Sequence, residues 1–184
     1  MRTQVAIIGA GPSGLLLGQL LGKAGIDHVI LERQSREYVL GRVRAGVLEE
    51  GTAELMDEVG AGANMHAHSL IHDGLSLAFA GRLHRIDLKH HSGKHVLVYG
   101  QTELTHDLTE ARAAKGYVTH YEADDVTPSG FDGDAPYVTW RKDGVEHRLD
   151  CEFIAGCDGY HGVSRRSVPP AAITNFERAF GTAW

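Results

Sequence analysis

The chain has 184 residues, 42% of them hydrophobic, and a formal net charge of -6 at pH 7. It is long enough to bury a core as one domain, or as one domain with the beginning of another, and its acidic balance argues against a general nucleic-acid or anionic-membrane binder. No apolar run has the length of a membrane span, and glycines interrupt the first apolar segment, so we expect a cytoplasmic protein without a signal peptide. The two cysteines, Cys151 and Cys157, form no metal motif and are expected to be reduced packing residues.

The first predicted element is a strand at residues 5–8, which runs into a glycine-rich turn at residues 9–14 with the sequence GAGPSG. The strand lacks the polar alternation of a half-exposed strand, which is typical of a strand buried on both faces of a parallel sheet. Gly9 permits a tight reversal, Gly11 lets backbone N–H groups approach a pyrophosphate, and Gly14 allows close packing of the following helix. Because the first N–H groups of a helix are unpaired and its dipole is positive there, the pattern predicts a dinucleotide site.

A helix and a second short strand follow the turn. The helix is expected to end at Gly25 and to turn one apolar stripe toward the sheet, formed by Leu17, Leu20, Leu21 and Ala24. Residues 28–31 predict a strand that delivers Glu32 at its carboxyl end, eighteen residues after Gly14. A carboxylate at that place accepts hydrogen bonds from an adenosine ribose, whereas an isolated Glu at a strand end is more often a solvated charge. The spacing favours the ribose contact.

Four arginines fall within twelve residues directly after Glu32, in a chain that is otherwise acidic. They are Arg33, Arg36, Arg42 and Arg44. Arg42 and Arg44 stand two apart, so in an extended segment both side chains project to one side, where guanidinium groups can hold phosphates. The alternative is a solvated loop that carries ordinary arginines.

The middle of the chain gives weaker patterns. Residues 47–59 have the apolar spacing of a helix, and residues 60–74, which contain Gly, Asn and His, are expected to form a loop. His66, His68 and His72 lie there without carboxylate or cysteine partners at ligand spacing, so we predict no metal site.

Three further elements precede the last third of the chain. Strands are predicted at residues 75–79 and 96–99. A helix is predicted at residues 101–114, and Gln101 at its start either reaches a cofactor or begins the helix without such a role.

The last third predicts an antiparallel meander. Its strands are expected at residues 117–121, 137–141 and 146–149. The dipeptide Asp143-Gly144 marks a tight hairpin between the last two.

A second strand-and-turn unit follows the meander. An apolar strand is predicted at residues 151–155, and Asp158 and Gly159 come directly after it. A basic helix start follows instead of the return strand of a hairpin. Because open α/β sheets bind ligands at the carboxyl ends of their strands, we expect this dipeptide to lie at the ligand site.

Taken together, these motifs resemble those of the single-component flavin aromatic hydroxylases. The resemblance rests on the glycine turn, Glu32, RVRAGVLE at 42–49, YGQTE at 99–103 and CDGYHG at 157–162, and it extends from residue 1 to about residue 178. It implies an α/β fold of the Rossmann-like FAD-binding type, in which a parallel sheet with a βαβ unit is joined by an antiparallel β-meander, incomplete relative to the family. It also implies FAD as the bound dinucleotide, NADPH as reductant and oxygen insertion into a phenol, with 4-hydroxybenzoate as substrate.

The resemblance assigns cofactor contacts by position. In addition to Gly9, Gly11 and Gly14 of the turn, FAD would contact Ser13, Glu32, Arg42, Val43, Arg44, Ala45, Gly46, Val47 and Gln101. Asp158 and Gly159 would serve both FAD and the nicotinamide cofactor. NADPH would also be held by Arg33, Gln34, Tyr38, Arg44, His161 and Arg165.

The resemblance changes near the end of the chain. The family's enzymes are about twice as long, and their phenol pocket lies on a sheet that begins near Phe176. We therefore expect a partial FAD-binding domain at residues 1–175 and the start of a substrate domain at residues 176–184, where residues 180–184 depart from the family pattern. No catalytic acid, base or substrate ligand is named, and the chain alone is expected to be inactive and to self-associate or pair with another chain.

Two other classes of function remain open at this point. A nicotinamide-dependent dehydrogenase uses the same kind of first turn. A non-catalytic dinucleotide-binding fragment is the second.

Overall fold

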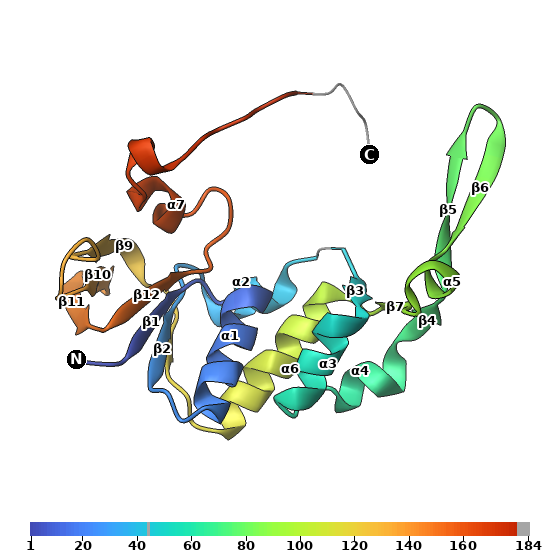
Figure 1. Cartoon of the computed structure of the whole chain (residues 1–184). Coiled ribbons are helices and arrows are strands. Elements are labelled where there is room, and N and C mark those ends of the chain that lie inside the picture. Colours follow the sequence, from blue (N-terminus) through green and yellow to red (C-terminus); the bar gives the residue numbers. More distant parts are fainter. Residues whose placement is uncertain (44, 180–184) are drawn as a thin grey trace.

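The computed structural model describes residues 1–43 and 45–179, and a four-stranded parallel sheet forms its centre (Figure 1). The sheet has the order β12-β1-β2-β8. Its strands are β1 (Val5–Ile8), β2 (His28–Leu31), β8 (Thr119–His120) and β12 (Phe153–Gly156). In β1, Val5 is paired with His28 on one side and with Phe153 on the other, and both pairings are parallel. The strand predicted at residues 5–8 is therefore an inner strand of a parallel sheet, as expected.

Two long helices cover one face of this sheet (Figure 1). They are α1 (Pro12–Lys23) and α6 (Gln101–Ala114). Ile7 and Ile30 of the sheet pack in one core with Leu15 of α1 and Leu108 of α6, and all four side chains are fully buried. Burial of an aliphatic side chain of this size contributes about 1.5–3 kcal/mol.

An antiparallel meander covers the opposite face. Its strands are β9 (Asp124–Ser129), β10 (Tyr137–Lys142) and β11 (Val145–Asp150). Because successive residues of a strand point to opposite faces, Ala6 and Ile8 of β1 face the meander, where they share a core with Val138, Trp140 and Leu149. The parallel sheet is thus the buried middle layer of three.

Helix α1 turns its predicted leucine stripe toward the core but buries a neighbouring face more deeply. Leu17, Leu20 and Leu21 are partly buried and pack against the core as expected, whereas Ala24 is exposed. The buried residues of α1 are Gly14, Leu15, Gly18 and Gln19. At Gly18 an added Cβ would come within 2.6 Å of Nη1 of Arg112 and 3.3 Å of the His28 ring, so Gly18 lets the helix approach these two large side chains. Gly25, with φ of 73°, follows the end of the helix as predicted.

A second, smaller antiparallel sheet lies beyond the helices, in the order β3-β7-β4. Its strands are β3 (Val47–Glu49), β7 (Val96–Val98) and β4 (Leu70–His72), and the helices between β3 and β4 are α3 (Glu50–Glu58) and α4 (Ala63–His68). The helix predicted at residues 47–59 is wrong at its first three residues, because Val47 pairs with Val98 across the sheet. The loop predicted at residues 60–74 is wrong as well, since α4 forms there and buries Met65 completely. Both outcomes depend on partners that are distant in the sequence.

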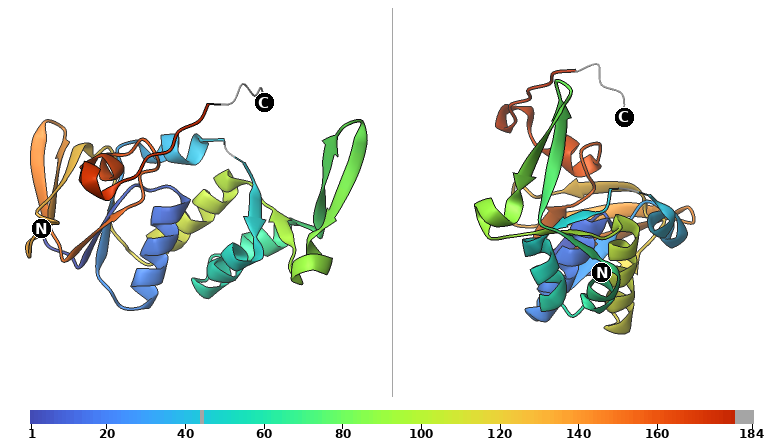
Figure 2. Two further views of the ribbon diagram at one scale, coloured as in Figure 1. Left: turned by 45° about the horizontal axis from the view of Figure 1, so that its top comes forward. Right: turned by 90° about the vertical axis from the view of Figure 1, so that its right-hand side faces the viewer.

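A hairpin projects from this second sheet, away from the rest of the chain (Figure 2). It consists of β5 (Gly74–Phe79) and β6 (Arg82–Asp87), and the short helix α5 (Leu88–Ser92) follows it. The strand predicted at residues 75–79 is confirmed. Leu77 faces His84 and Phe79 faces Arg82 across the ladder. The hairpin holds little of the core, because Leu77 and Phe79 are 48% and 60% exposed.

The last third differs from the predicted meander in its pairing. The strand predicted at residues 117–121 is reduced to β8 and joins the parallel sheet, and β9, which was not predicted, completes the meander. Asp143 and Gly144 have φ of 52° and 77°, the left-handed conformations that a two-residue hairpin needs, so the predicted turn is confirmed. The strand predicted at residues 151–155 is found as β12.

The remaining helices are short. They are α2 (Arg36–Gly41), α7 (Val163–Ser167) and the 3-10 turn η1 (Pro170–Ala172). Residues 173–179 contain no helix or strand and are largely exposed. None of the helices in the described part of the chain combines the length and the apolar content needed to cross a membrane.

Candidate functional site

The glycine turn between β1 and α1 is held by backbone contacts that leave no room for side chains. Gly9 has φ of 106°, and an added Cβ would lie 2.6 Å from the carbonyl oxygen of Cys157. At Gly14 an added Cβ would lie 2.0 Å from the carbonyl oxygen of Gly9. Gly11 differs, because an added Cβ would have no described neighbour within 4 Å. Gly9 and Gly14 are therefore required by the turn itself, and the open side of Gly11 is where a ligand can approach the backbone.

The N-terminus of α1 is open to an anion. Gly11 is its N-cap, and no side chain caps the helix. Pro12 at the first position has no N–H to satisfy, and the exposed Ser13 follows it. With no acidic side chain in the first turn, the partial positive charge of the helix end is left for a bound group.

Glu32 lies beside this turn, directly after β2. Its Oε2 accepts a hydrogen bond from the N–H of Ala10 at 2.7 Å, and its Oε1 accepts one from the N–H of Gln34 at 2.8 Å. The two bonds fix the carboxylate at the carboxyl edge of the sheet, at the side of the glycine turn. An ionised carboxylate has about four acceptor positions, so the half-exposed group retains capacity for ribose hydroxyls.

The residues after Glu32 differ in how firmly they are held. Arg33 and Tyr38 are exposed, and Gln34 is partly buried. Helix α2 begins after Ser35, whose Oγ accepts a hydrogen bond from the N–H of Tyr38 at 3.2 Å. These side chains are therefore available to a ligand but are not fixed in a pocket.

The next predicted contacts lie on residues 42–47, referred to below as the 42–47 segment. Arg44 is outside the described residues, so its predicted role is not placed. Arg42, Val43, Ala45 and Val47 are exposed, and Gly46 is partly buried. Gly46 lies against the start of α6, where an added Cβ would come within 2.9 Å of the Cα of Gly100. The segment is thus next to Gln101, the first residue of α6, as the resemblance implies.

Asp158 and Gly159 join the glycine turn at the end of β12. The N–H of Cys157 donates to the carbonyl oxygen of Ile8 at 2.8 Å, and a Cβ added to Gly9 would lie 3.0 Å from the Cα of Asp158. Oδ2 of Asp158 accepts a hydrogen bond from the N–H of Ser164 at 3.0 Å. The carboxylate therefore sits over the start of α7, next to the turn predicted to bind pyrophosphate.

The last two predicted cofactor residues lie on the segment after β12. His161 is exposed, and its ring packs edge-on against Tyr160 with centroids 5.1 Å apart. Arg165 lies over the face of Tyr160 at 4.4 Å and donates from Nη2 to Oδ1 of Asn175 at 2.6 Å. Arg165 thus has protein partners in this structure, while His161 is open to solvent.

The structure brings the predicted residues together in two groups at the carboxyl edge of the parallel sheet and the start of α6. The first group is Gly9, Gly11, Ser13, Gly14, Glu32, Asp158 and Gly159. The second is the described part of the 42–47 segment with Gln101. Thr102 was not among the predicted contacts, and its Oγ1 donates to the carbonyl oxygen of Arg42 at 3.2 Å. The sequence signal for Thr102 was its place in the YGQTE motif at residues 99–103, directly after Gln101.

The residues present fit a dinucleotide. The N-terminus of α1 has no side-chain cap, the position of a Cβ on Gly11 is open, and a carboxylate held by backbone N–H groups stands beside both. These are the donors, the space and the acceptor that a pyrophosphate and its ribose require.

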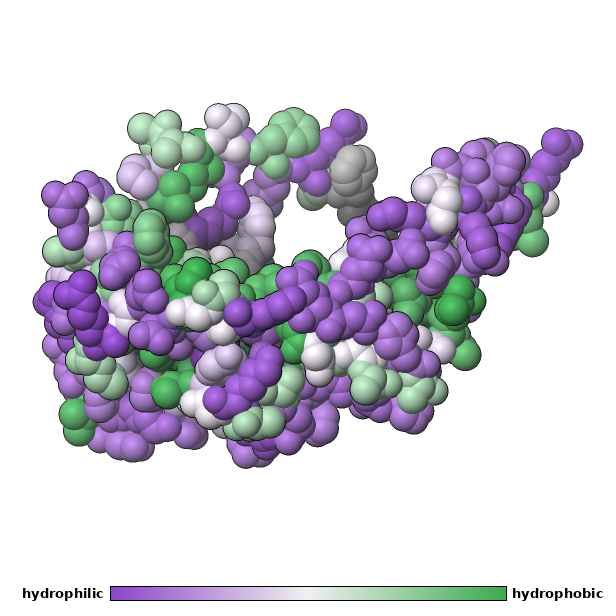
Figure 3. Space-filling model, turned by 60° about the horizontal axis from the view of Figure 1, so that its bottom comes forward, coloured by the Kyte–Doolittle hydropathy of each residue, from purple (hydrophilic) through white to green (hydrophobic). Residues whose placement is uncertain are grey.

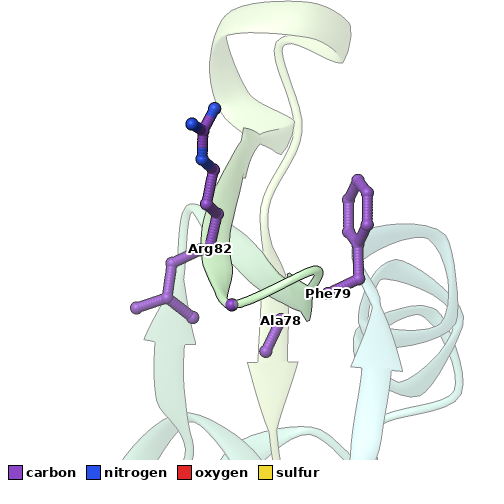
Figure 4. Close-up of a pocket in the computed structure, with 5 residues that line it drawn as sticks. Ala78, Phe79 and Arg82 are labelled. Carbon is purple, nitrogen blue, oxygen red and sulfur yellow. The ribbon is translucent and has the colours of Figure 1, made fainter.

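Two shallow hollows in the described surface lie away from the glycine turn. One of about 320 Å³ is at the tip of the projecting hairpin, where Phe79 and Arg82 rise on one side and Ala78 points to the other (Figure 4). A second of about 350 Å³ is lined by Asn64, His68, Tyr99 and Glu103. The face drawn in Figure 3 is mostly hydrophilic, with hydrophobic residues where the hairpin leaves the body. Among the described residues, no group of three or more His, Cys, Asp or Glu is arranged to hold a metal ion.

Comparison with known proteins places this geometry in a family. Residues 2–183 match the family model described as FAD binding domain. The chain is 48% identical to the p-hydroxybenzoate hydroxylase of Acinetobacter baylyi, over 100% of this chain and 46% of that protein. It is 27% identical to 3-(3-hydroxy-phenyl)propionate/3-hydroxycinnamic acid hydroxylase 2 of Burkholderia vietnamiensis, over 95% of this chain and 33% of that protein. The chain thus spans less than half the length of these curated relatives.

A solved structure gives the same fold. PqsL of Pseudomonas aeruginosa, in complex with 2-aminobenzoylacetate, superposes with a TM-score of 0.78 at 19% identity. The match covers 98% of this chain and 48% of that one. At this identity the likeness concerns the fold alone, and it confirms the predicted Rossmann-like FAD-binding architecture.

Proposed function

The chain belongs to the FAD binding domain family, and from this premise we propose that it is the FAD-binding portion of a flavin-dependent aromatic hydroxylase that acts on 4-hydroxybenzoate. In the proposed reaction 4-hydroxybenzoate, NADPH, a proton and O2 yield 3,4-dihydroxybenzoate, NADP+ and water, with one oxygen atom of O2 entering the ring and the other leaving as water. The substrate follows from the relative at 48% identity, a p-hydroxybenzoate hydroxylase. The nicotinamide-dependent dehydrogenase that the first turn leaves open is not favoured, because the matching family is described by FAD binding.

The observation that carries the proposal is the position of Glu32. Its two carboxylate oxygens are fixed by the N–H groups of Ala10 and Gln34, at 2.7 and 2.8 Å, so the group is held beside the open N-terminus of α1. A carboxylate held in this way accepts the two hydroxyls of an adenosine ribose. The alternative, a solvated carboxylate at a strand end, does not require two backbone donors.

The protein's part in the reaction is to bind and orient. We propose that the backbone of Gly11, Ser13 and Gly14 holds the pyrophosphate of FAD and that Glu32 holds its ribose. The 42–47 segment and Gln101 are proposed to line the flavin half. When bound, FAD supplies the electron transfer from the nicotinamide and the activation of oxygen.

The nicotinamide cofactor is proposed to be NADPH. Asp158 and Gly159 would serve both cofactors, because they lie next to the glycine turn. The other residues proposed for NADPH are Arg33, Gln34, Tyr38, Arg44, His161 and Arg165. To bind a phosphate, Arg165 would have to release its hydrogen bond to Asn175. Its planar guanidinium group would then donate to the phosphate oxygens in a forked geometry.

Three wider expectations belong to the same proposal. The division into a domain at residues 1–175 and the beginning of a substrate domain at residues 176–184 stays a prediction, as does a cytoplasmic location. We also propose that the chain associates with itself or with another chain. The alternative of a non-catalytic dinucleotide-binding fragment is not favoured, because the relative at 48% identity is a hydroxylase.

The proposal is tested with purified chain and FAD. Binding is measured by titration calorimetry and by the visible absorption band of the flavin at about 450 nm, which the nicotinamide cofactors lack. FAD is expected to bind to the chain, whereas NADH added without FAD is not expected to bind. A product assay with FAD, NADPH and 4-hydroxybenzoate, beside a light-scattering mass, then tests the expectation that the chain alone does not hydroxylate. Failure to bind FAD would refute the assigned function, and product formation by a monomer would refute the assignment of the phenol site to another part of the enzyme.

A further inference from the structure

The 42–47 segment is bonded at one end to the first turn of α6 and at the other end to Tyr99, between β7 and α6. At one end Oγ1 of Thr102 donates to the carbonyl oxygen of Arg42, where α2 stops. At the other end the N–H of Tyr99 donates to the carbonyl oxygen of Gly46 at 2.8 Å. The second bond continues the β3–β7 ladder, in which Val47 faces Val98, by one more residue. The segment is therefore tied to one short stretch of chain, residues 99–102.

The approach at Gly46 is as close as backbone allows. An added Cβ would lie 2.9 Å from the Cα of Gly100 and 3.0 Å from the carbonyl oxygen of Tyr99. Both neighbours are backbone atoms, which cannot move aside as the end of a flexible side chain can. A side chain at Gly46 would therefore displace the 42–47 segment from α6.

Tyr99, the first residue of this stretch, is held in a triangle of polar side chains that three hydrogen bonds join. The Tyr99 hydroxyl donates to Oδ2 of Asp107 at 2.5 Å and accepts from Nδ2 of Asn64 at 2.7 Å. Asn64 also donates to Oδ1 of Asp107 at 3.1 Å. The triangle joins α4, the end of β7 and α6, and only 3% of Tyr99 is exposed. Burial, together with the bond to Asp107, raises the pKa of Tyr99 well above its ordinary value, so the hydroxyl stays a donor.

The two halves of a dinucleotide would thus meet different parts of the chain. The ADP half is assigned to the glycine turn and Glu32, which contact β12 and β2. The 42–47 segment depends instead on the start of α6. The hydrogen bonds described for the two groups involve separate residues, so one group can be altered without breaking the contacts of the other.

We propose that Thr102 is a positioning residue that, with the Gly46 to Gly100 contact, sets the described residues of the 42–47 segment for the flavin half of FAD while leaving the ADP half unaffected. The inference rests on the proposed function. The hydroxyl of Thr102 need not touch the cofactor to act in this way.

The test compares the affinities of FAD and ADP, measured by titration calorimetry, in the unchanged chain and four variants. Thr102→Val removes the hydroxyl at nearly constant shape and is expected to weaken FAD binding about three- to tenfold, the range of one hydrogen bond, with ADP binding unchanged. Gly46→Ala is expected to weaken FAD binding by more than about tenfold, again without a change for ADP. Thr102→Ser keeps the hydroxyl and is expected to restore the affinity for FAD.

The matched control is Thr109→Val, two turns farther along the same helix. Its hydroxyl donates within α6, to the carbonyl oxygen of Thr105 at 2.7 Å, so both affinities are expected to match the unchanged chain. A merely structural role for Thr102 would lower both affinities together, and this result would overturn the inference.

The outcomes for the inference and for the proposed function are separate. If the unchanged chain binds neither FAD nor ADP, the proposed function fails and the inference fails with it. If it binds both and Thr102→Val binds FAD as the unchanged chain does, only the inference fails.

Discussion

The carboxyl edge of the parallel sheet and the β5–β6 hairpin are held together in different ways. At the sheet edge, the conformation is fixed by backbone atoms in close contact, such as the carbonyl oxygen of Cys157 beside Gly9, and by a carboxylate that accepts two backbone N–H groups. In the hairpin, the ladder supplies the bonds, and large apolar side chains stand in solvent: Leu83 is 77% exposed and Phe79 is 60% exposed.

The sheet edge is fixed by contacts within the described chain, whereas the hairpin leaves large apolar side chains exposed. Two-stranded hairpins are marginally stable by themselves, and exposed apolar side chains in such numbers favour association. Each Å² of apolar surface removed from water contributes about 25 cal/mol. We therefore expect changes at the sheet edge to act on stability and ligand binding, and changes in the hairpin to act on association.

The largest effect is expected at Gly14. Gly14→Ala would place a Cβ 2.0 Å from the carbonyl oxygen of Gly9, and the free energy of unfolding is expected to fall by about 3 kcal/mol, at the upper end for overpacking. Urea unfolding measures it. Gly11→Ala is the control, because its Cβ meets open space: we expect a loss of less than about 1 kcal/mol together with weaker FAD binding. Equal losses in the two variants would show that the turn is not as tight as described.

A smaller effect is expected at Glu32. Glu32→Ala is expected to weaken FAD binding by about 1.5–3 kcal/mol, the scale for a hydrogen bond to a charged group. Titration calorimetry measures the dissociation constant. Glu37→Ala, an exposed glutamate on α2, is the matched control and should leave the constant unchanged. An unchanged constant in the Glu32 variant would remove that residue from the site.

The third effect depends on pH and concerns the contact of α6 with His28, the first residue of β2. His28 is buried and accepts a hydrogen bond at Nε2 from Nη1 of Arg112 at 2.7 Å, while its Nδ1 bonds the carbonyl oxygen of Ile26 at 3.0 Å. Desolvation lowers the pKa of His28, opposed by that carbonyl, and the Arg112 charge lowers it further while Asp27 raises it. Burial also lowers the pKa of Arg112, to about 10. Protonated His28 cannot accept from Arg112.

The sign follows from the lowered pKa. The folded chain binds this proton less readily than the unfolded chain, so the stability that neutral His28 provides is present above about pH 6.5 and is lost as the pH falls through the folded pKa. As the pH falls through this range, the free energy of unfolding measured with urea is expected to fall by on the order of 1 kcal/mol. His28→Gln should flatten this dependence of stability on pH. Some slope remains, because burial also lowers the pKa of His120. His90→Gln on the exposed α5 should change nothing, and a slope unaffected by His28→Gln would contradict the assignment.

The smallest effect on stability is expected in the hairpin. Replacing Leu77 and Phe79 by Ser should change the free energy of unfolding by less than about 0.5 kcal/mol per site, because both side chains are exposed. The light-scattering mass, in contrast, is expected to fall toward that of a monomer. Replacing the exposed Val145 by Ser, at the meander turn, is the control. A mass that the hairpin variant leaves unchanged would move the association surface elsewhere.

The sequence by itself determined the glycine turn, the strand that delivers Glu32, the helix at residues 101–114 and the Asp143-Gly144 hairpin. Each of these depends on neighbours in the chain: a backbone conformation that only small residues adopt readily, or an apolar spacing sustained over several turns. The adjacency of Asp158 to the first turn was also foreseen, because strand ends of one parallel sheet share an edge.

The tertiary structure decided the rest. Val47 forms a strand because Val98 offers an edge, and Met65 forms part of a helix because a core is there to bury it. The glycine face of α1 was decided by Arg112, which reaches Gly18 from a helix more than ninety residues away. The role proposed for Thr102 likewise needed the fold, since its bond to Arg42 joins residues sixty apart. Local patterns carry no record of such partners, because free energy of packing is shared between segments that meet only when the chain has folded.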